Sequence, residues 1–264
     1  MSQFAVDVST YMTTAVETVT ENATLEEANA QLAALDVSAL PVLDGQGRAA
    51  GVISRTDLLR AGRVHVDEGS RRHTLKLPDA KVREFMTATV EVVTPSTPLW
   101  DAARRMVRQH YHRLFVAEDS RLVGVISTRE MMRAIAEVRL ATPVSEITSD
   151  SVVKVKADDP LALAVDRMAA AHRSGLVVVE DDWPVGIFTQ VEALEARDAN
   201  PQAPVHDWMD MRVLSLPTTM PVHMAAGQAL ATGARRLLTI ETLGVAGIAT
   251  GMDFTRLVSD SHKG

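Results

Sequence analysis

Hydrophobic and polar positions follow one order four times along the chain. A short β-branched segment precedes an amphipathic helix, then two apolar strands joined by a polar turn, then a second helix. In the first copy, Val16–Thr20 predicts the strand and Thr24–Leu35 the helix, with Leu25, Leu32 and Leu35 on its apolar face. The other first strands are predicted over Val90–Val93, Val152–Val155 and Arg212–Leu216. The hairpins are predicted to join Ala39–Leu43 to Ala50–Ile53, Leu114–Ala117 to Leu122–Ile126, Leu176–Val179 to Val185–Phe188, and Leu237–Ile240 to Val245–Ala249.

Helix starts are marked by capping residues. Thr24 with Glu27 forms the spacing of a capping box, in which the hydroxyl and the acid each satisfy a free backbone N–H. In the later copies Pro98, Pro160 and Pro221 suit the first helical position, where a missing N–H costs nothing.

Two sequence markers recur at intervals that agree to within one residue. The first is a glycine, two apolar residues, Ser or Thr, two variable residues and an acid, found over 51–57, 124–130, 186–192 and 247–253. Its glycines are 73, 62 and 61 residues apart. The second marker lies upstream at Met12, Met86, Thr148 and Met209, with intervals of 74, 62 and 61 residues. The agreement identifies four internal repeats, and Thr148 in place of Met predicts a looser contact in the third.

The repeats span about 8–61, 82–138, 144–197 and 205–260 and predict a mixed α/β fold of β-α-β-β-α units. A unit of about 60 residues buries too little surface to be stable alone. We therefore expect two pairs of repeats, over residues 1–140 and 141–264, packed sheet against sheet. Gly62–Ala80 is expected to be an inserted loop and Asp198–Pro204 a linker.

The amino-acid composition excludes or disfavours several classes of function. The 264 residues contain no cysteine, 4% aromatic residues and a net charge of −7, which exclude thiolate chemistry and disfavour nucleic-acid binding. The first basic residue is Arg48 and no apolar run approaches the roughly 20 residues of a membrane span, so we expect a cytoplasmic protein without membrane segments. The histidines at 110, 112 and 172 have no acidic partner at ligand spacing, so they predict no metal site. The sequence has no hydrolase motif and no phosphate-loop motif, so it predicts no catalysis.

The repeat order, the Met-Thr sequence at residues 12–13 and 86–87, and the glycine-to-acid marker resemble the cystathionine-β-synthase (CBS) domain family. The resemblance covers nearly the whole chain as four repeats in two tandem pairs, an architecture similar to that of the γ subunit of AMP-activated protein kinase. Residues 37–42 look like a nucleotide-lining strand of that subunit.

The Ser/Thr-x-x-acid part of the marker has two compatible interpretations. It is the pattern of a helix cap, and four helices need four caps. The family resemblance adds a ligand role, with hydroxyls toward a phosphate and the acid on ribose hydroxyls. The residues concerned are Ser54, Thr56, Asp57, Ser127, Glu130, Thr189, Glu192, Thr250 and Asp253. Glu130 and Glu192 replace the usual Asp, which predicts weak or empty sites in those copies.

The resemblance also implies that residues just before each hairpin face the phosphates of a ligand held by the paired repeat. Asp57 would share a cleft with His112 and Arg113, Glu130 with Ser38 and Ala39, Glu192 with Arg235 and Arg236, and Asp253 with Ser174 and Gly175. Arginine suits phosphate because its guanidinium forms paired hydrogen bonds. For Arg235 and Arg236, the alternative is an interaction with the end of the preceding helix.

These features predict a regulatory, non-enzymatic module. Its ligand is expected to be AMP, ADP, ATP or S-adenosylmethionine, and its output a change of conformation read by a protein partner or by self-association as a homodimer. The alternative is a structural, dimerising scaffold whose clefts bind no ligand.

Overall fold

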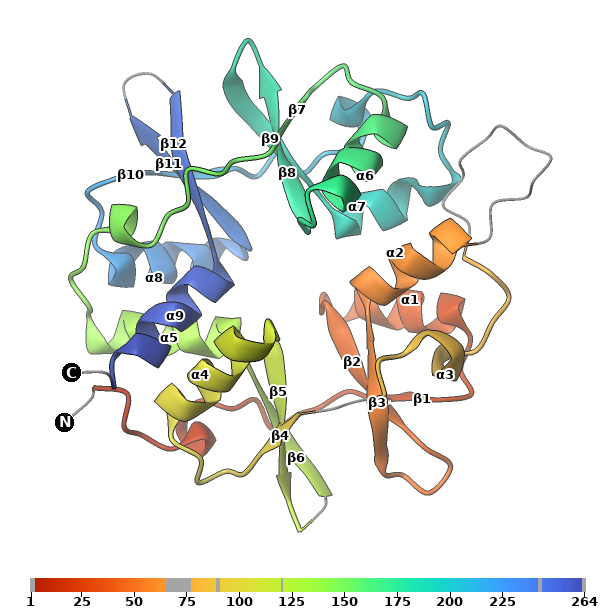
Figure 1. The fold of residues 1–264 in the computed structure, drawn as a ribbon, viewed down its shortest axis with the longest axis vertical. Coiled ribbons are helices and arrows are strands. Elements are labelled where there is room, and N and C mark those ends of the chain that lie inside the picture. The colour runs from red at the N-terminus through yellow and green to blue at the C-terminus, as the bar shows by residue number, and fades with distance from the viewer. Residues whose placement is uncertain (1–2, 65–76, 89–90, 120, 242–243, 263–264) are drawn as a thin grey trace. The chain divides into compact units, whose positions relative to one another are not determined.

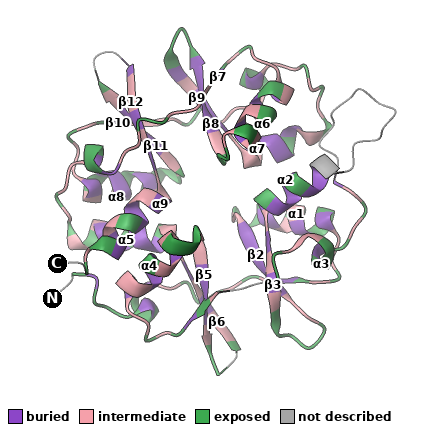
Figure 2. Cartoon of the chain, viewed as in Figure 1, coloured by how far each residue is buried: buried purple, intermediate pink, exposed green. Residues whose placement is uncertain are grey.

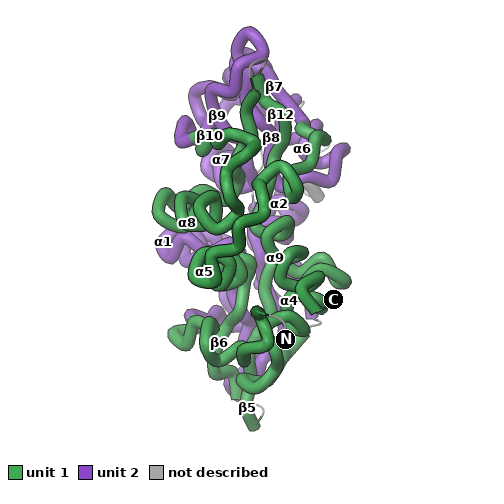
Figure 3. Tube along the Cα trace, turned by 90° about the vertical axis from the view of Figure 1, so that its left-hand side faces the viewer, with its two compact units in different colours: residues 1–16, 91–152, 213–264 green, residues 17–90, 153–212 purple. Residues whose placement is uncertain are grey.

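The computed structural model describes residues 3–64, 77–88, 91–119, 121–241 and 244–262 (Figure 1). The chain forms two compact units, coloured separately in Figure 3. Unit 1 comprises residues 1–16, 91–152 and 213–264, and unit 2 comprises residues 17–90 and 153–212. Most of the expected insertion over Gly62–Ala80, residues 65–76, lies outside the described residues.

Unit 2 contains the three-stranded sheets of the first and third repeats. In each sheet the first strand is parallel to the second, and the second is antiparallel to the third. The first repeat consists of β1 (Val19–Thr20), α1 (Leu25–Ala34), β2 (Ala39–Leu43), β3 (Ala49–Ser54) and α2 (Arg55–Val64). The third consists of β7 (Lys154–Lys156), α6 (Leu161–Ala170), β8 (Gly175–Glu180), β9 (Trp183–Thr189) and α7 (Gln190–Glu195), which the turn η3 (Ala196–Asp198) follows. Helix α2 packs against α7.

Unit 1 contains the second and fourth repeats with the same sheet topology. The second repeat consists of β4 (Val92–Val93), α4 (Leu99–Gln109), β5 (Arg113–Glu118), β6 (Arg121–Ser127) and α5 (Thr128–Val138). The fourth consists of β10 (Leu214–Pro217), α8 (Val222–Thr232), β11 (Arg236–Glu241), β12 (Gly244–Thr250) and α9 (Gly251–Asp260). Helix α4 packs against α9, and α5 packs against α8 and α9. The predicted β-α-β-β-α order is confirmed in all four repeats.

A lead-in segment precedes each repeat and joins the sheet of another repeat. We define the lead-ins as residues 8–13, 82–87, 144–149 and 205–210. They contain η1 (Val8–Thr10), α3 (Val82–Phe85), η2 (Val144–Glu146) and η4 (Val205–Asp207). Each one exchanges two backbone hydrogen bonds with the third strand of its neighbour in sequence. The bonded pairs are Thr13 with Val125, Thr87 with Val52, Ser149 with Ile248, and Asp210 with Ile187. The first two repeats therefore exchange lead-ins, and so do the last two.

The two recurring sequence markers touch each other. A Cβ added to Gly51 would lie 2.7 Å from the Thr87 oxygen and 2.9 Å from the Met86 sulfur. A Cβ on Gly124 would lie 2.8 Å from the Met12 sulfur. Gly186 lies against Met209 in the same way, and Gly247 lies against Thr148. The markers keep matching intervals because each glycine makes room for the lead-in of the paired repeat.

Each unit has its own hydrophobic core, built from both halves of the sequence (Figure 2). In unit 1, Leu99 and Ile135 of the second repeat belong to the same buried cluster as Val222 and Phe254 of the fourth. In unit 2, Leu25 and Leu58 share a cluster with Val178 and Phe188. The cores therefore tie repeats from opposite halves of the chain together.

Two local expectations need correction. Leu35 does not extend the buried face of α1, because the helix ends at Ala34 and Leu35 is 38% exposed as the C-cap. Pro98, Pro160 and Pro221 occupy the N-cap, one residue before the first helical position. Each has an extended backbone, with ψ of 139°, 147° and 138°, so it closes the preceding loop and leaves the first helical turn to the next residue.

The expected division at residue 140 stays a prediction. All four lead-in exchanges lie within a half, whereas the helix packing and the cores join the halves. We expect fragments 1–140 and 141–264 each to unfold cooperatively in urea. We also expect them to self-associate, because the α4–α5 and α8–α9 faces lose their partners; sedimentation measures this. If neither fragment folds while the full chain does, the division is wrong.

Candidate functional site

The predicted caps are present at the four helices that follow the hairpins. In α2 the Ser54 N–H and hydroxyl donate to Asp57 Oδ2 at 2.9 and 2.6 Å. The corresponding distances are 2.8 and 2.5 Å from Ser127 to Glu130, 2.6 and 2.5 Å from Thr189 to Glu192, and 2.7 and 2.8 Å from Thr250 to Asp253. Glutamate and aspartate thus accept the same pair of hydrogen bonds. The cap interpretation of the marker is confirmed, and it engages one oxygen of every candidate acid.

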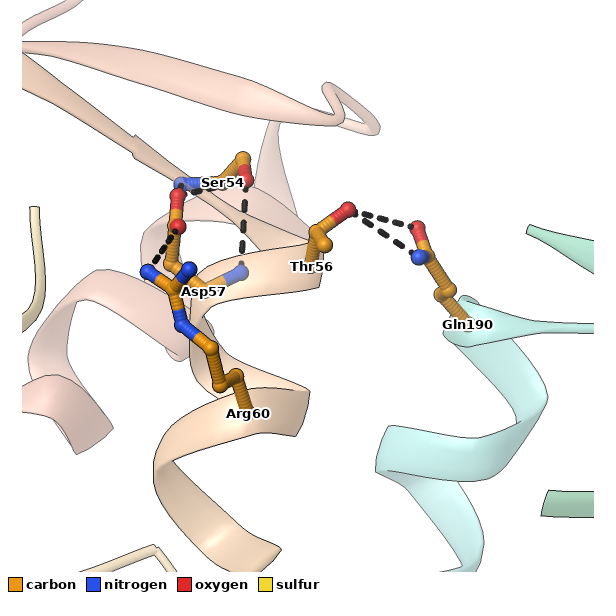
Figure 4. A network of polar contacts seen from close by, with 5 residues as sticks. All are labelled: Ser54, Thr56, Asp57, Arg60 and Gln190. Carbon is orange, nitrogen blue, oxygen red and sulfur yellow. Dashed lines mark hydrogen bonds and ion pairs between the residues drawn. The ribbon is translucent and has the colours of Figure 1, made fainter. Parts of the chain in front are cut away.

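The second carboxylate oxygen of the capping acid has different partners in different repeats. Asp57 Oδ1 accepts a bond of 3.0 Å from Arg60, and Asp253 Oδ1 accepts one from Arg256 (Figure 4 shows the first pair). Glu130 Oε1 instead accepts a bond of 3.3 Å from the Thr13 hydroxyl of a lead-in. The arginines are exposed, so their ion pairs are weak enough for a ligand to displace.

The candidate residues where each hairpin begins lie beside the cap of their own repeat, and the second of each pair is the first residue of the strand. Strand register places Ala39 opposite Ser54, Arg113 opposite Ser127, Gly175 opposite Thr189, and Arg236 opposite Thr250. The first helical N–H donates to the carbonyl of Ser38 in α2, of His112 in α5 and of Ser174 in α7, at 3.1, 3.1 and 3.4 Å. Each repeat therefore places its acid and its pre-hairpin residues at one end of its sheet.

The basic candidates gather in unit 1. His112, Arg113, Arg235 and Arg236 all belong to this unit, together with the capped acids Glu130 and Asp253. Desolvation lowers the pKa of His112, and the charges of Arg113 and Arg236 lower it further, against the effect of Asp253. Desolvation also lowers the pKa of Arg113 to about 10, with Glu130 raising and Arg235 lowering it. His112 and Arg113 of the second repeat therefore lie within electrostatic reach of charged residues of the fourth.

Unit 2 has small, neutral residues at the same positions. Ser38, Ala39, Ser174 and Gly175 take the places of the four basic residues. The acids Asp57 and Glu192 lie in this unit. Each cleft expected from the sequence would combine an acid of one unit with pre-hairpin residues of the other, so those four pairings stay predictions.

A second acid adjoins the third repeat's cap. Burial raises the pKa of Glu195, and the charge of Glu192 raises it further, whereas Arg55 opposes this effect. Glu195 occupies the position that Arg60 holds relative to Asp57 and Arg256 relative to Asp253. The third repeat thus has an acid at the position where the first and fourth repeats have an arginine that pairs with the capping aspartate.

Sequence reasoning missed Arg55. This residue is 6% exposed, and its guanidinium donates to the carbonyls of Val37 and Leu32 at 3.1 Å each. It joins the end of α1 to the start of α2 and thereby fixes Ser38 beside Ser54. The other repeats have Thr128, Gln190 and Gly251 at this position, so the repeat pattern carries no signal for it.

Two contacts between repeats were also missed. The Gln190 amide reaches the Thr56 hydroxyl, with Nε2 donating at 3.0 Å, and so connects the starts of α7 and α2 (Figure 4). In unit 1, a Cβ on Gly251 would lie 2.5 Å from Thr128 Oγ1, so α9 begins directly against α5. Neither contact has a sequence signal, because each joins residues that are more than 120 positions apart.

Two kinds of feature are absent from the described part of the chain. Across these ranges no three His, Asp or Glu side chains form a group that could hold a metal ion. Nor does any helix there have both the length and the apolar character needed to span a membrane.

Comparison with known proteins identifies similar chains. The family model for the CBS domain matches residues 8–63, 82–137 and 144–199. The fourth repeat is outside those matches, but it has the same element order and sheet topology. Protein MJ1225 of Methanocaldococcus jannaschii is 27% identical over 194 residues, which are 68% of this chain and 66% of that protein.

Solved structures show the same fold. The crystal structure of MJ1225 matches 96% of this chain and 99% of its own, with a TM-score of 0.82 and 17% identity. A conserved protein of Pyrococcus horikoshii matches 96% of this chain and 100% of its own, with a TM-score of 0.67 and 21% identity. The four-repeat fold is therefore found in both archaeal proteins.

Proposed function

This chain belongs to the CBS domain family, and on that premise we propose that it is a regulatory module that binds an adenine nucleotide. The ligand would lie at the capped helix starts, with a carboxylate on the ribose hydroxyls and hydroxyls or basic groups on the phosphates. The module would bind its ligand without converting it. Its output would be a change in the relative arrangement of the repeats, read by a protein partner or by a second copy of the chain.

The gathering of four basic side chains in unit 1 carries this proposal. His112, Arg113, Arg235 and Arg236 accompany only two candidate acids there, each already engaged in a cap. These residues suit an anionic ligand, because arginine and the N-terminus of a helix both favour phosphate oxygens. A phosphorylated adenosine fits this chemistry better than S-adenosylmethionine, whose sulfonium is a cation.

The repeats are not equivalent in this proposal. The first repeat offers Ser54, Thr56 and Asp57 on a helix of ten residues, and the second and fourth offer Ser127 with Glu130 and Thr250 with Asp253. The third offers Thr189 and Glu192 on a helix of only six residues, with the acidic Glu195 adjacent. We expect the third repeat to contribute least to anion binding.

The structure of MJ1225 is described as that of a candidate archaeal homologue of the γ subunit of AMP-activated protein kinase. A module of this kind would act on another protein, which agrees with the proposed output. The present chain would then need a partner or self-association to transmit the state of its sites.

A scaffold that binds no nucleotide is the second candidate. The capped acids favour it, because Asp57 and Asp253 already use both oxygens within their own helix. In this case the repeats would serve only to hold partner surfaces in place.

A ligand panel separates the two candidates. We expect AMP, ADP or ATP to raise the melting temperature of the protein more than adenosine or S-adenosylmethionine does. A ligand at 100 times its dissociation constant adds about 2.7 kcal/mol to the free energy of unfolding, which thermal denaturation detects readily. Absence of stabilisation by every compound, repeated by calorimetry, would establish the scaffold instead.

A further inference from the structure

The start of α2 has a neighbour that no repeat pattern predicts. Thr56 is the only hydroxyl among the residues directly before the four candidate acids, where the other repeats have Arg129, Val191 and Met252. Its side chain meets Gln190 of the third repeat, 134 positions away in the sequence (Figure 4). The start of α2 therefore contacts a residue from the other half of the chain.

The atoms of this contact allow two arrangements. Gln190 Nε2 lies 3.0 Å from Thr56 Oγ1 and can donate to it, whereas Gln190 Oε1 lies 3.3 Å away and can accept from it. A threonine hydroxyl has one hydrogen to donate and two lone pairs to accept with. When the amide donates, the Thr56 hydrogen stays available to a ligand; when the amide accepts, that hydrogen is used.

A phosphate group distinguishes these arrangements, because its oxygens accept hydrogen bonds from Thr56. We propose that Gln190 is a positioning residue for the phosphate end of a nucleotide bound at α2. Its amide donates to Thr56 Oγ1 and so directs the Thr56 hydrogen toward the phosphate. This inference rests on the proposed function and extends it, since it makes nucleotide binding in the first repeat depend on a side chain of the third.

Stability does not account for the contact. Thr56 is exposed, and a hydrogen bond between exposed groups contributes little because water replaces it when it is lost. By contrast, the neighbouring Arg55 is buried and bonds two carbonyls of its own repeat. Arg55 thus stabilises this helix start, and Gln190 is available to orient the Thr56 hydroxyl toward a ligand.

The test compares AMP with adenosine by calorimetry. Gln190→Ala is expected to weaken AMP binding roughly two- to tenfold, the effect of losing one neutral hydrogen bond, and to leave adenosine unchanged. Gln190→Glu should weaken AMP binding further, because its carboxylate only accepts hydrogen bonds and repels the phosphate. In a Thr56→Val background, Gln190→Ala should have no additional effect. Gln202→Ala, an exposed glutamine of the same unit, serves as the matched control.

The outcomes separate this inference from the proposed function. If the wild-type protein binds AMP more tightly than adenosine but Gln190→Ala leaves that preference unchanged, the inference is wrong and the proposed function stands. The inference is also wrong if Gln190→Ala weakens AMP and adenosine equally, because this indicates a structural role. If the wild-type protein binds none of AMP, ADP, ATP and adenosine, the proposed function itself is overturned.

Discussion

Replacing Asp57 by alanine is expected to weaken the binding of AMP and adenosine alike, roughly ten- to a hundredfold. The proposed carboxylate bonds go to the ribose, which both ligands share, and one charge-assisted hydrogen bond contributes about 1.5–3 kcal/mol. Asp57 is 5% exposed and already oriented by Ser54, so little side-chain freedom is lost when a ligand binds. Calorimetry with both ligands measures the change.

The control for this prediction is another cap in the same unit. Glu27 closes a capping box with Thr24 at the start of α1, with bonds of 2.7 and 3.1 Å. Glu27→Ala should lower the free energy of unfolding by about 0.5–2 kcal/mol, as loss of a cap does, without changing affinity. If Asp57→Ala behaves as Glu27→Ala does, Asp57 is a helix cap and nothing more.

Two further variants test candidate residues of unit 1. Arg113→Ala should weaken AMP binding and leave adenosine nearly unchanged, because a guanidinium contributes only where a phosphate is present. Glu130→Ala should matter less than Asp57→Ala, since the longer side chain fits the ribose poorly and its second oxygen already accepts from Thr13. Equal losses of AMP and adenosine in Arg113→Ala would contradict the assignment of Arg113 to the phosphate.

Gly51→Ala is expected to destabilise unit 2 by about 1–3 kcal/mol, the usual cost of adding a methyl group where no space exists. The new Cβ would lie 2.7 Å from a backbone oxygen, that of Thr87, and backbone cannot rotate away as a side chain can. The equivalent Gly124→Ala should cost less, because its nearest neighbour is the flexible end of Met12. Urea unfolding followed by circular dichroism gives both values.

Gly45→Ala is the matched control. This glycine is exposed in the turn between the strands of the same hairpin, and a Cβ there would meet nothing within 4 Å. Its unfolding free energy should stay within about 0.5 kcal/mol of the wild-type value. Equal stability of Gly51→Ala and Gly45→Ala would show that the lead-in does not press on β3.

The local parts of this protein can be predicted from its sequence, because their interactions span few residues. A helix cap joins residues three positions apart, so the cap formed by Ser54 and Asp57 can be recognised as a sequence motif, and the structure contains it. Strands joined by a short turn pair with their nearest neighbours, so the hairpins and the fourfold order were also predicted. Even the glycine and methionine markers were visible as a repeat, although their contact was not.

The interactions between repeats depended on tertiary structure. The sequence gives no reason why α5 packs against α8 and α9, because the faces that meet are chosen by the complementarity of side chains more than 80 residues apart. The same packing gathers the basic residues of the second and fourth repeats in one unit and brings Gln190 to Thr56. Arg55 points inward because two carbonyls at the end of α1 are within its reach, and only the folded chain places them there. Sequence motifs therefore predict interactions between residues that are close along the chain. The partners of a site are determined by the packing of segments that are far apart in the sequence.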